Sequence, residues 1–202
     1  MTWDAQARDR QILGGPERLP LLDDTHLDDR HRAAMDHLRV LYGYAEDLPL
    51  DPFFATLAHS PEFFAGYMAL GVAIGTRSAL TPRMRELAIL RTVWLHGAPY
   101  AWGEHVHVTR SGLFAEVDIE RIVEGSGAAG WNEADRAILR AAEDLHADAM
   151  IAEPTWQALA GHLDERQLLE LPILVGHYVM TAFLQNSVRT RLTAHGKGLA
   201  AR

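Results

Sequence analysis

Apolar residues recur along most of the chain at intervals of three and four positions, and no long window alternates strictly between apolar and polar residues. This spacing is typical of amphipathic helices rather than strands. Capping residues, several followed by proline at the first helical position, precede the periodic stretches. These helix starts are Thr25, Asp51, Ser60, Thr81, Asn132, Glu153 and Asp164. The pattern predicts an all-α protein, a compact bundle of about eight or nine helices joined by short loops.

The chain of 202 residues is long enough for one hydrophobic core and short for two ordinary domains. Glycines and prolines in residues 1–24 predict an extended N-terminal arm. Residues 25–194 are predicted as a single helical domain, and residues 195–202 as a frayed tail. Within the domain, the segment Gly125–Gly130 is expected to be the most flexible link. Pro172 is expected to break or kink a helix.

The most apolar stretch runs from Phe63 to Gly75. A membrane-spanning helix needs roughly 20 apolar residues, so this stretch is too short and predicts a buried core helix instead. The segment Met1–Gln11 has no apolar signal-peptide core, and we therefore expect a cytoplasmic protein. The net charge of −8 and the lack of basic runs argue against nucleic acid as a partner.

The chain contains no cysteine, which excludes disulfides, thiolate metal sites and thiol catalysis. Its 11 histidines raise the question of metal binding. His105 and His107, two positions apart, diverge by about 200° around a helix and are not placed to share one ion. No other compact ligand set is present. We therefore expect neither a metal ion nor another cofactor.

The segment Thr81–Leu113 predicts a helical hairpin. One helix runs from Pro82 to about His96, a turn lies around Gly97–Pro99, and a second helix continues to Ser111. The hairpin carries the ionisable residues of greatest interest.

Glu86 shares a helical stripe with apolar Leu90 and Val93, and His105 lies on the apolar side of the second helix. His107 points to the polar side instead. A carboxylate and an imidazole facing each other across a hairpin form an acid–base pair. The alternative is a buried hydrogen bond that only fixes the hairpin. In an ideal antiparallel hairpin the two residues are offset by roughly 9 Å, at about 1.5 Å per residue, and side-chain length or a crossing angle must close that gap.

These residues resemble the carboxymuconolactone decarboxylase superfamily, which includes the alkylhydroperoxidase D-like proteins. The resemblance extends over roughly residues 48–192 and includes the segment Leu163–Val188. The peroxidase branch uses a Glu-x11-Cys-x2-Cys-x3-His arrangement. Counting from Glu86, that spacing reaches Ala98, Ala101 and His105. Both thiol positions are alanine, so the peroxidase reaction is excluded. The implied fold is alkylhydroperoxidase D-like.

The decarboxylase branch implies removal of CO2 from an unsaturated lactone without a cofactor. In that reaction His105 would act as the general acid and Glu86 as its orienting partner, the two candidate catalytic residues. An arginine would hold the substrate carboxylate, with Arg83, Arg85 and Arg91 as candidates, although an arginine in such a position is more often a solvated surface charge.

Three further residues are candidates for substrate binding. Tyr100 and Trp102 would form a pocket wall or simply pack the hairpin. His177 falls on an apolar face and is interpreted either as a core residue or as part of a shared pocket.

Two functional hypotheses follow. The first is a cofactor-independent acid–base enzyme that acts on a small carboxylated or enolisable molecule by decarboxylation, isomerisation or cyclisation. The second is a catalytically silent binding or assembly protein that keeps the fold, with Glu86 and His105 as internal partners. A cavity open to solvent at both residues would favour the first. The resemblance also implies self-association, which we expect to give trimers or hexamers.

Overall fold

The computed structural model describes residues 4–22, 24–29, 32, 33, 36, 51–110 and 112–202. Within these ranges the chain forms nine α-helices, two short 3-10 turns and no strand, which confirms the all-α prediction. The helices are α1 (Ala5–Leu13), α3 (Pro52–Leu57), α4 (Pro61–Arg77), α5 (Pro82–Leu95), α6 (Pro99–Thr109), α7 (Glu116–Glu124), α8 (Glu133–Asp148), α9 (Glu153–Ala160) and α10 (Glu165–Val188), and the 3-10 turns are η1 (Asp24–His26) and η2 (Gly198–Ala200).

Capping bonds place most of these helices. The Thr81 side chain accepts a hydrogen bond from the Met84 amide at the start of α5, and Asn132 does the same from Asp135 before α8. Asp164 and Gln167 form a reciprocal capping box at the start of α10. The Ser60 side chain makes no capping bond, so Pro61 is the remaining local signal for the start of α4. The helix expected after Thr25 lies largely outside the described residues.

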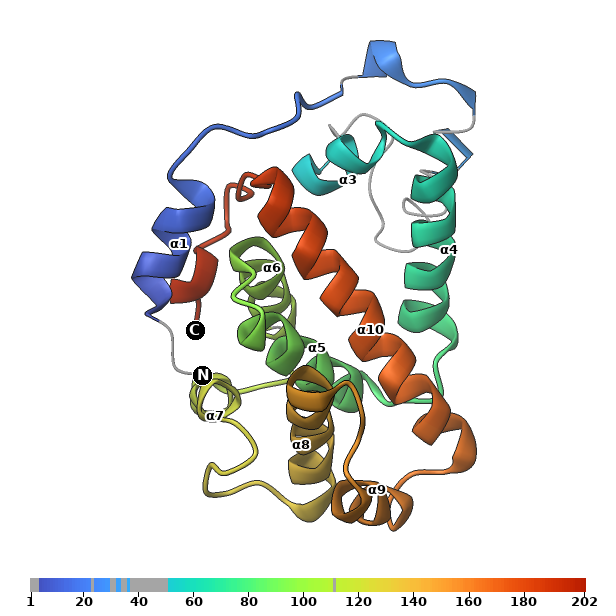
Figure 1. Ribbon diagram of the computed structural model, residues 1–202, viewed down its shortest axis with the longest axis vertical. Coiled ribbons are helices and arrows are strands. Elements are labelled where there is room, and N and C mark those ends of the chain that lie inside the picture. Colours follow the sequence, from blue (N-terminus) through green and yellow to red (C-terminus); the bar gives the residue numbers. More distant parts are fainter. Residues whose placement is uncertain (1–3, 23, 30–31, 34–35, 37–50, 111) are drawn as a thin grey trace.

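Helices α5 and α10 form the centre of the fold. Every residue of α5 from Leu87 to Val93 is buried, and α5 packs against α6, α7, α8 and α10. In Figure 1, α10 crosses the middle of the molecule, with α3 and α4 on one side and α5 and α6 on the other. The length and composition of α10 would also suit a membrane span, but it contacts helices on several sides and we interpret it as a core helix.

Two predictions about helices need correction. Helix α4 is not a buried core helix, because only Phe64, Met68 and Ile74 of its residues are buried and Phe63 is 80% exposed. Pro172 does not break its helix, which runs continuously over Glu165–Val188, and only the kink stays a prediction.

The N-terminal arm is not extended throughout, because α1 occupies its first half. Asp4 caps α1, and the helix-breaking glycines begin only after Leu13. The Arg8 guanidinium donates hydrogen bonds to the carbonyl oxygens of Gly97 and His96. These bonds fasten α1 to the turn between α5 and α6.

The C-terminal tail is docked rather than frayed. Leu199 is fully buried, and the Trp102 indole donates a 3.1 Å hydrogen bond to the Ala201 carbonyl. The Leu199 amide also donates to the Asp9 carboxylate in α1. In Figure 1 the C-terminus accordingly lies beside α1. The sequence of the tail did not predict this packing, because it is rich in glycine and alanine and neither residue is a strong indicator of burial.

The glycine-rich segment Gly125–Gly130 is also held in place, contrary to the prediction of a flexible link. Ser126 donates hydrogen bonds to Glu143 through both its amide and its hydroxyl group, and the Arg136 guanidinium donates to the Ser126 carbonyl. Gly125 has a φ of 107°, which an L side chain rarely adopts. The glycine therefore permits a tight turn, and the surrounding charges fix it.

Candidate functional site

The hairpin of α5 and α6 brings Glu86 and His105 into direct contact. Nδ1 of His105 donates a hydrogen bond of 2.8 Å to Oε2 of Glu86. The axial offset expected for an ideal hairpin therefore does not keep the two side chains apart. The His105 side chain is 20% exposed and that of Glu86 14%, so the pair is sheltered but not sealed. Because Nδ1 is occupied, Nε2 is the nitrogen of His105 left for another molecule.

His105 lines a cavity of about 170 Å³ between α3, α4, α6 and α10. Glu86 is not part of the cavity wall and lies behind His105. Apolar groups form part of the wall, chiefly Phe53, Phe54, Met68 and Tyr178. The polar and ionisable residues of the wall are Asp51, Tyr67, Tyr100, Glu104, His105, His177, Thr181 and Gln185.

Asp51 and Tyr100 form one polar pair of this wall. The Tyr100 hydroxyl donates a hydrogen bond to Oδ1 of Asp51, and the Phe53 amide donates to the same oxygen. Burial raises the pKa of Asp51 above its ordinary value of 3.8, while the bond from Tyr100 opposes that rise. Tyr100 was expected as a pocket residue. Asp51 had been interpreted only as a helix cap, and its position before proline carried no second signal.

A second polar group joins α4 to α10. The Thr181 hydroxyl donates to the backbone carbonyl of His177 at 2.8 Å, so the Tyr67 hydroxyl is the donor in its 2.6 Å contact with Thr181. The Gln185 side chain accepts a bond from the Ala101 amide near the start of α6. These bonds hold the wall opposite His105 in one arrangement.

His177 lies deep in the cavity wall and is only 5% exposed. Its ring packs 4.5 Å from the Tyr67 ring and 5.4 Å from the Tyr178 ring, measured between centroids. Burial, with a smaller contribution from the nearby His105, lowers the pKa of His177 from 6.5 to about 4. The imidazole is therefore neutral at physiological pH.

The three arginines expected to hold a carboxylate lie elsewhere. Arg83 pairs with Asp135 of α8 at 2.8 Å, and Arg91 pairs with Glu143 of α8 at 2.8 Å. Arg85 donates to the Leu80 carbonyl at 2.9 Å. None of the three lines the cavity of His105. Periodicity alone did not show that α8 faces this side of α5.

Trp102 likewise does not form the pocket wall. Its side chain is completely buried, packs 4.8 Å from the Trp94 ring, and is anchored by Ala201 of the tail. Its role is in packing. His107 is exposed and stacks on His195, with ring centroids 4.2 Å apart, as the polar side of α6 predicted.

The cavity wall is acidic rather than basic. Among the described residues that line it, none is lysine or arginine, whereas Asp51 and Glu104 are carboxylic acids. A carboxylate ligand would have no guanidinium or ammonium partner there and would approach like charges, which is unfavourable at low dielectric. The described part of the chain also has no group of three or more metal-ligating side chains.

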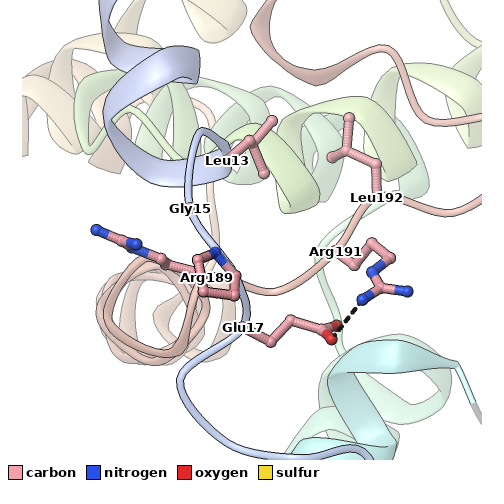
Figure 2. A pocket seen from close by; sticks show the side chains of 7 residues that line it. Leu13, Gly15, Glu17, Arg189, Arg191 and Leu192 are labelled. Carbon is pink, nitrogen blue, oxygen red and sulfur yellow. Dashed lines mark hydrogen bonds and ion pairs between the residues drawn. The ribbon is translucent and has the colours of Figure 1, made fainter.

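A separate hollow of about 240 Å³ lies between the end of α1 and the segment after α10. Figure 2 shows Glu17 facing Arg191, with an ion pair of 2.8 Å, while Arg189 extends away from them. Gly15 and Leu13 complete the wall on the side of α1. This contact joins the N-terminal segment to the C-terminal segment, and the hollow shares no lining residue with the cavity of His105.

The fold is that of the alkylhydroperoxidase D-like class. Solved structures with this fold include an uncharacterized peroxidase-related protein from Ralstonia eutropha JMP134, described as an alkylhydroperoxidase AhpD core (19% identity, 89% of this chain and 94% of that chain, TM-score 0.75). The debrominase Bmp8 in complex with 2,3,4-tribromopyrrole is also similar (12% identity, 89% and 95% coverage, TM-score 0.71). A protein of unknown function from Agrobacterium tumefaciens matches at 20% identity over 67% of this chain and 94% of its own, with a TM-score of 0.63.

Residues 61–144 match the model of the carboxymuconolactone decarboxylase family. These residues are therefore similar to that family, the fold is alkylhydroperoxidase D-like, and the resemblance inferred from the sequence is confirmed. The absence of cysteine sets it apart from the thiol peroxidase pattern. No curated protein sequence gave a significant match.

Proposed function

We propose that this protein is a cofactor-independent acid–base enzyme, in which His105 exchanges a proton with a small molecule bound in the cavity. The observation that carries the proposal is the 2.8 Å bond from His105 to Glu86 at the edge of that cavity. Glu86 acts as a positioning residue. Its carboxylate fixes the proton on Nδ1, leaves the lone pair on Nε2 and stabilises the imidazolium that forms.

The simplest reaction is transfer of a proton between two atoms of the same substrate. Nε2 of His105 removes a proton from a carbon next to a carbonyl group, and the electron pair of the broken bond moves to the carbonyl oxygen. The resulting enolate is protonated again by the His105 imidazolium at the same or a conjugated carbon. No oxidant or leaving group is needed. Isomerisation and cyclisation use this step directly, and decarboxylation uses its second half.

The lining of the cavity favours an uncharged substrate over a carboxylated one. No described lining residue is lysine or arginine, and the three candidate arginines are engaged elsewhere. Decarboxylation of an anionic lactone is therefore less well supported than isomerisation of a neutral carbonyl compound. The similar debrominase is described with 2,3,4-tribromopyrrole, a small flat ring, which is compatible with this preference.

The alternative is a silent binding or assembly protein that retains the fold. In such a protein the space beside His105 would be filled by side chains. The cavity of about 170 Å³ beside His105 and the partial exposure of that residue favour the enzyme, although Glu86 itself does not line the cavity.

The experiment is solvent deuterium exchange. The protein is incubated in D2O with carboxymuconolactone and with a set of small neutral ketones and lactones, and both deuterium uptake and CO2 are followed by mass spectrometry. We expect uptake into at least one neutral compound, reduced by about 10²- to 10⁴-fold in a folded His105→Ala variant. The proposal would be contradicted if, for every compound tested, deuterium uptake with the parent protein were no greater than with the variant.

We also propose that the protein self-associates as a trimer or hexamer. Apolar side chains of α4 and α10 are exposed, with Phe63 at 80%, Leu169 at 64% and Phe183 at 60%. An apolar groove of about 550 Å³ lies between the same helices. Burying such a surface against other copies would remove apolar area from water. Light scattering that gives a monomer at micromolar concentration would contradict this. The cytoplasmic location stays a prediction.

A further inference from the structure

His177 has a hydrogen-bonding capacity that the described protein does not use. Its Nδ1 atom is buried and has no hydrogen-bond partner among the described residues. Buried polar atoms in folded proteins nearly always have a partner, because an unpaired one costs free energy. A buried N–H group without a partner is rarer than a buried acceptor without one, so we place the ring proton of the neutral imidazole on Nε2, the nitrogen that is then left to donate to a ligand.

Gly71 of α4 opens the space in front of the other ring nitrogen. A Cβ atom at Gly71 would lie 3.6 Å from Nε2 of His177 and 3.9 Å from its Cε1 atom, with no other contact within 4 Å. Both residues line the cavity. The absence of a side chain at Gly71 therefore leaves Nε2 accessible to a small molecule.

The two imidazoles of the cavity differ in chemistry. His105 is bonded to a carboxylate, which stabilises its protonated form when it takes up a proton. His177 has no carboxylate partner and is neutral at physiological pH, so it offers one N–H donor and one lone pair. The Tyr178 ring contacts both, at 5.0 Å from the His105 ring and 5.4 Å from the His177 ring. One imidazole is thus suited to exchange protons and the other to hold a neutral oxygen.

We propose that His177 and Gly71 form an oxygen-binding subsite, in which the Nε2 proton of the neutral imidazole donates a hydrogen bond to the carbonyl oxygen of an uncharged substrate. This inference rests on the proposed function and names the substrate class: a small, neutral, enolisable ketone or lactone. As His105 removes the carbon-bound proton, negative charge develops on that oxygen and strengthens the bond from His177. His177 keeps its own proton throughout.

The test measures binding of two molecules of similar shape, neutral cyclohexanone and anionic cyclohexanecarboxylate. The protein carries nitrogen-15 in its histidines, and the Nε2 signal of His177 is followed by NMR during titration. We expect cyclohexanone to shift this signal and to bind more tightly than the carboxylate. The Gly71→Ala substitution places a methyl group against Nε2 and should weaken cyclohexanone binding by about tenfold, as should His177→Phe.

Gly75→Ala is the matched control. Gly75 lies in the same helix, and a Cβ atom there would meet nothing within 4 Å. Both alanine substitutions favour the helix equally, so thermal unfolding should shift alike in the two variants, and only Gly71→Ala should lose affinity. Equal affinity in the two variants, tighter binding of the carboxylate, or no binding of cyclohexanone would each overturn the inference.

A third variant separates this inference from the proposed function. His105→Ala should still bind cyclohexanone, because the oxygen is held by His177, but should lose deuterium exchange. If exchange depends on His105 while Gly71→Ala binds like the parent, the subsite is wrong and the acid–base function stands. If exchange survives in His105→Ala, the proposed function itself fails.

Discussion

The two faces of α5 use ionisable residues in opposite ways. Toward α8, Arg91 is almost saturated: it pairs with Glu143 and donates to the carbonyl oxygens of Ile122 and Val123, both at 2.9 Å. Toward α6, Glu86 pairs with His105, whose second nitrogen remains at the edge of a cavity. A charged group whose bonding capacity is filled by the protein stabilises the fold. An ionisable group that keeps an unused hydrogen-bonding atom beside a cavity is available to react with a ligand.

The largest effect on stability is expected on the saturated face. An Arg91→Met variant leaves the Glu143 carboxylate without its cation and should lower the free energy of unfolding by about 3 to 5 kcal/mol. Arg166→Met is the control, because the Arg166 side chain is 63% exposed and pairs with Glu170 four residues further along α10. Its cost should stay under about 1 kcal/mol. Chemical denaturation measures both, and similar losses in the two variants would show that saturation of Arg91 is unimportant.

The second-largest effect on stability is expected in acid, where the unfolded chain protonates His177. Its pKa of about 4 in the folded chain lies below the ordinary value of 6.5, so between these values the unfolded chain binds a proton that the folded chain does not. Stability is therefore unaffected by this group above pH 6.5 and falls by about 3 kcal/mol as the pH drops to about 4.

Substitution of His177 should remove this acid loss. A His177→Phe variant is expected to lack it, whereas His107→Phe, at an exposed position on α6, should retain it. Urea unfolding measured between pH 7 and pH 4 tests the difference. The same acid loss in all three proteins would assign it to other groups.

The smallest effect on stability is expected for Glu86→Gln on the open face. The amide oxygen still accepts the hydrogen bond from His105, so unfolding should change by under about 1 kcal/mol. Deuterium exchange should nevertheless fall by about 10²-fold or more, because a neutral amide does not stabilise the imidazolium. A variant that loses stability but keeps its exchange rate would identify the pair as structural.

Much of the fold could be predicted because local signals agree with the tertiary packing. Thr81, Asn132 and Asp164 mark helix starts that the structure has at the same residues. The hairpin also turns at Gly97, as its sequence predicts. The sequence pattern does not predict α1, because the glycines and prolines after it favour an extended arm over all of residues 1–24. Burial of the tail depends on a contact with Trp102, which is distant in sequence.

The site was predictable only where it is local. Glu86 and His105 lie in one hairpin, so helical spacing was enough to suggest that they face each other. The arginines were assigned wrongly because the faces of α5 that meet α6 and α8 cannot be distinguished without tertiary contacts. The bond between Tyr100 and Asp51 joins segments that are distant in the sequence, as does the bond between Tyr67 and Thr181. No pattern along the chain indicates either bond.

The most direct test compares two histidines of one helix in the same reaction. Deuterium uptake into a neutral ketone is measured for His105→Ala, which loses the cavity imidazole, and for His107→Ala, which loses an exposed one two residues away. We expect uptake to fall by at least about 10²-fold in the first variant and to stay near the parental rate in the second. Equal rates in the two variants would contradict it.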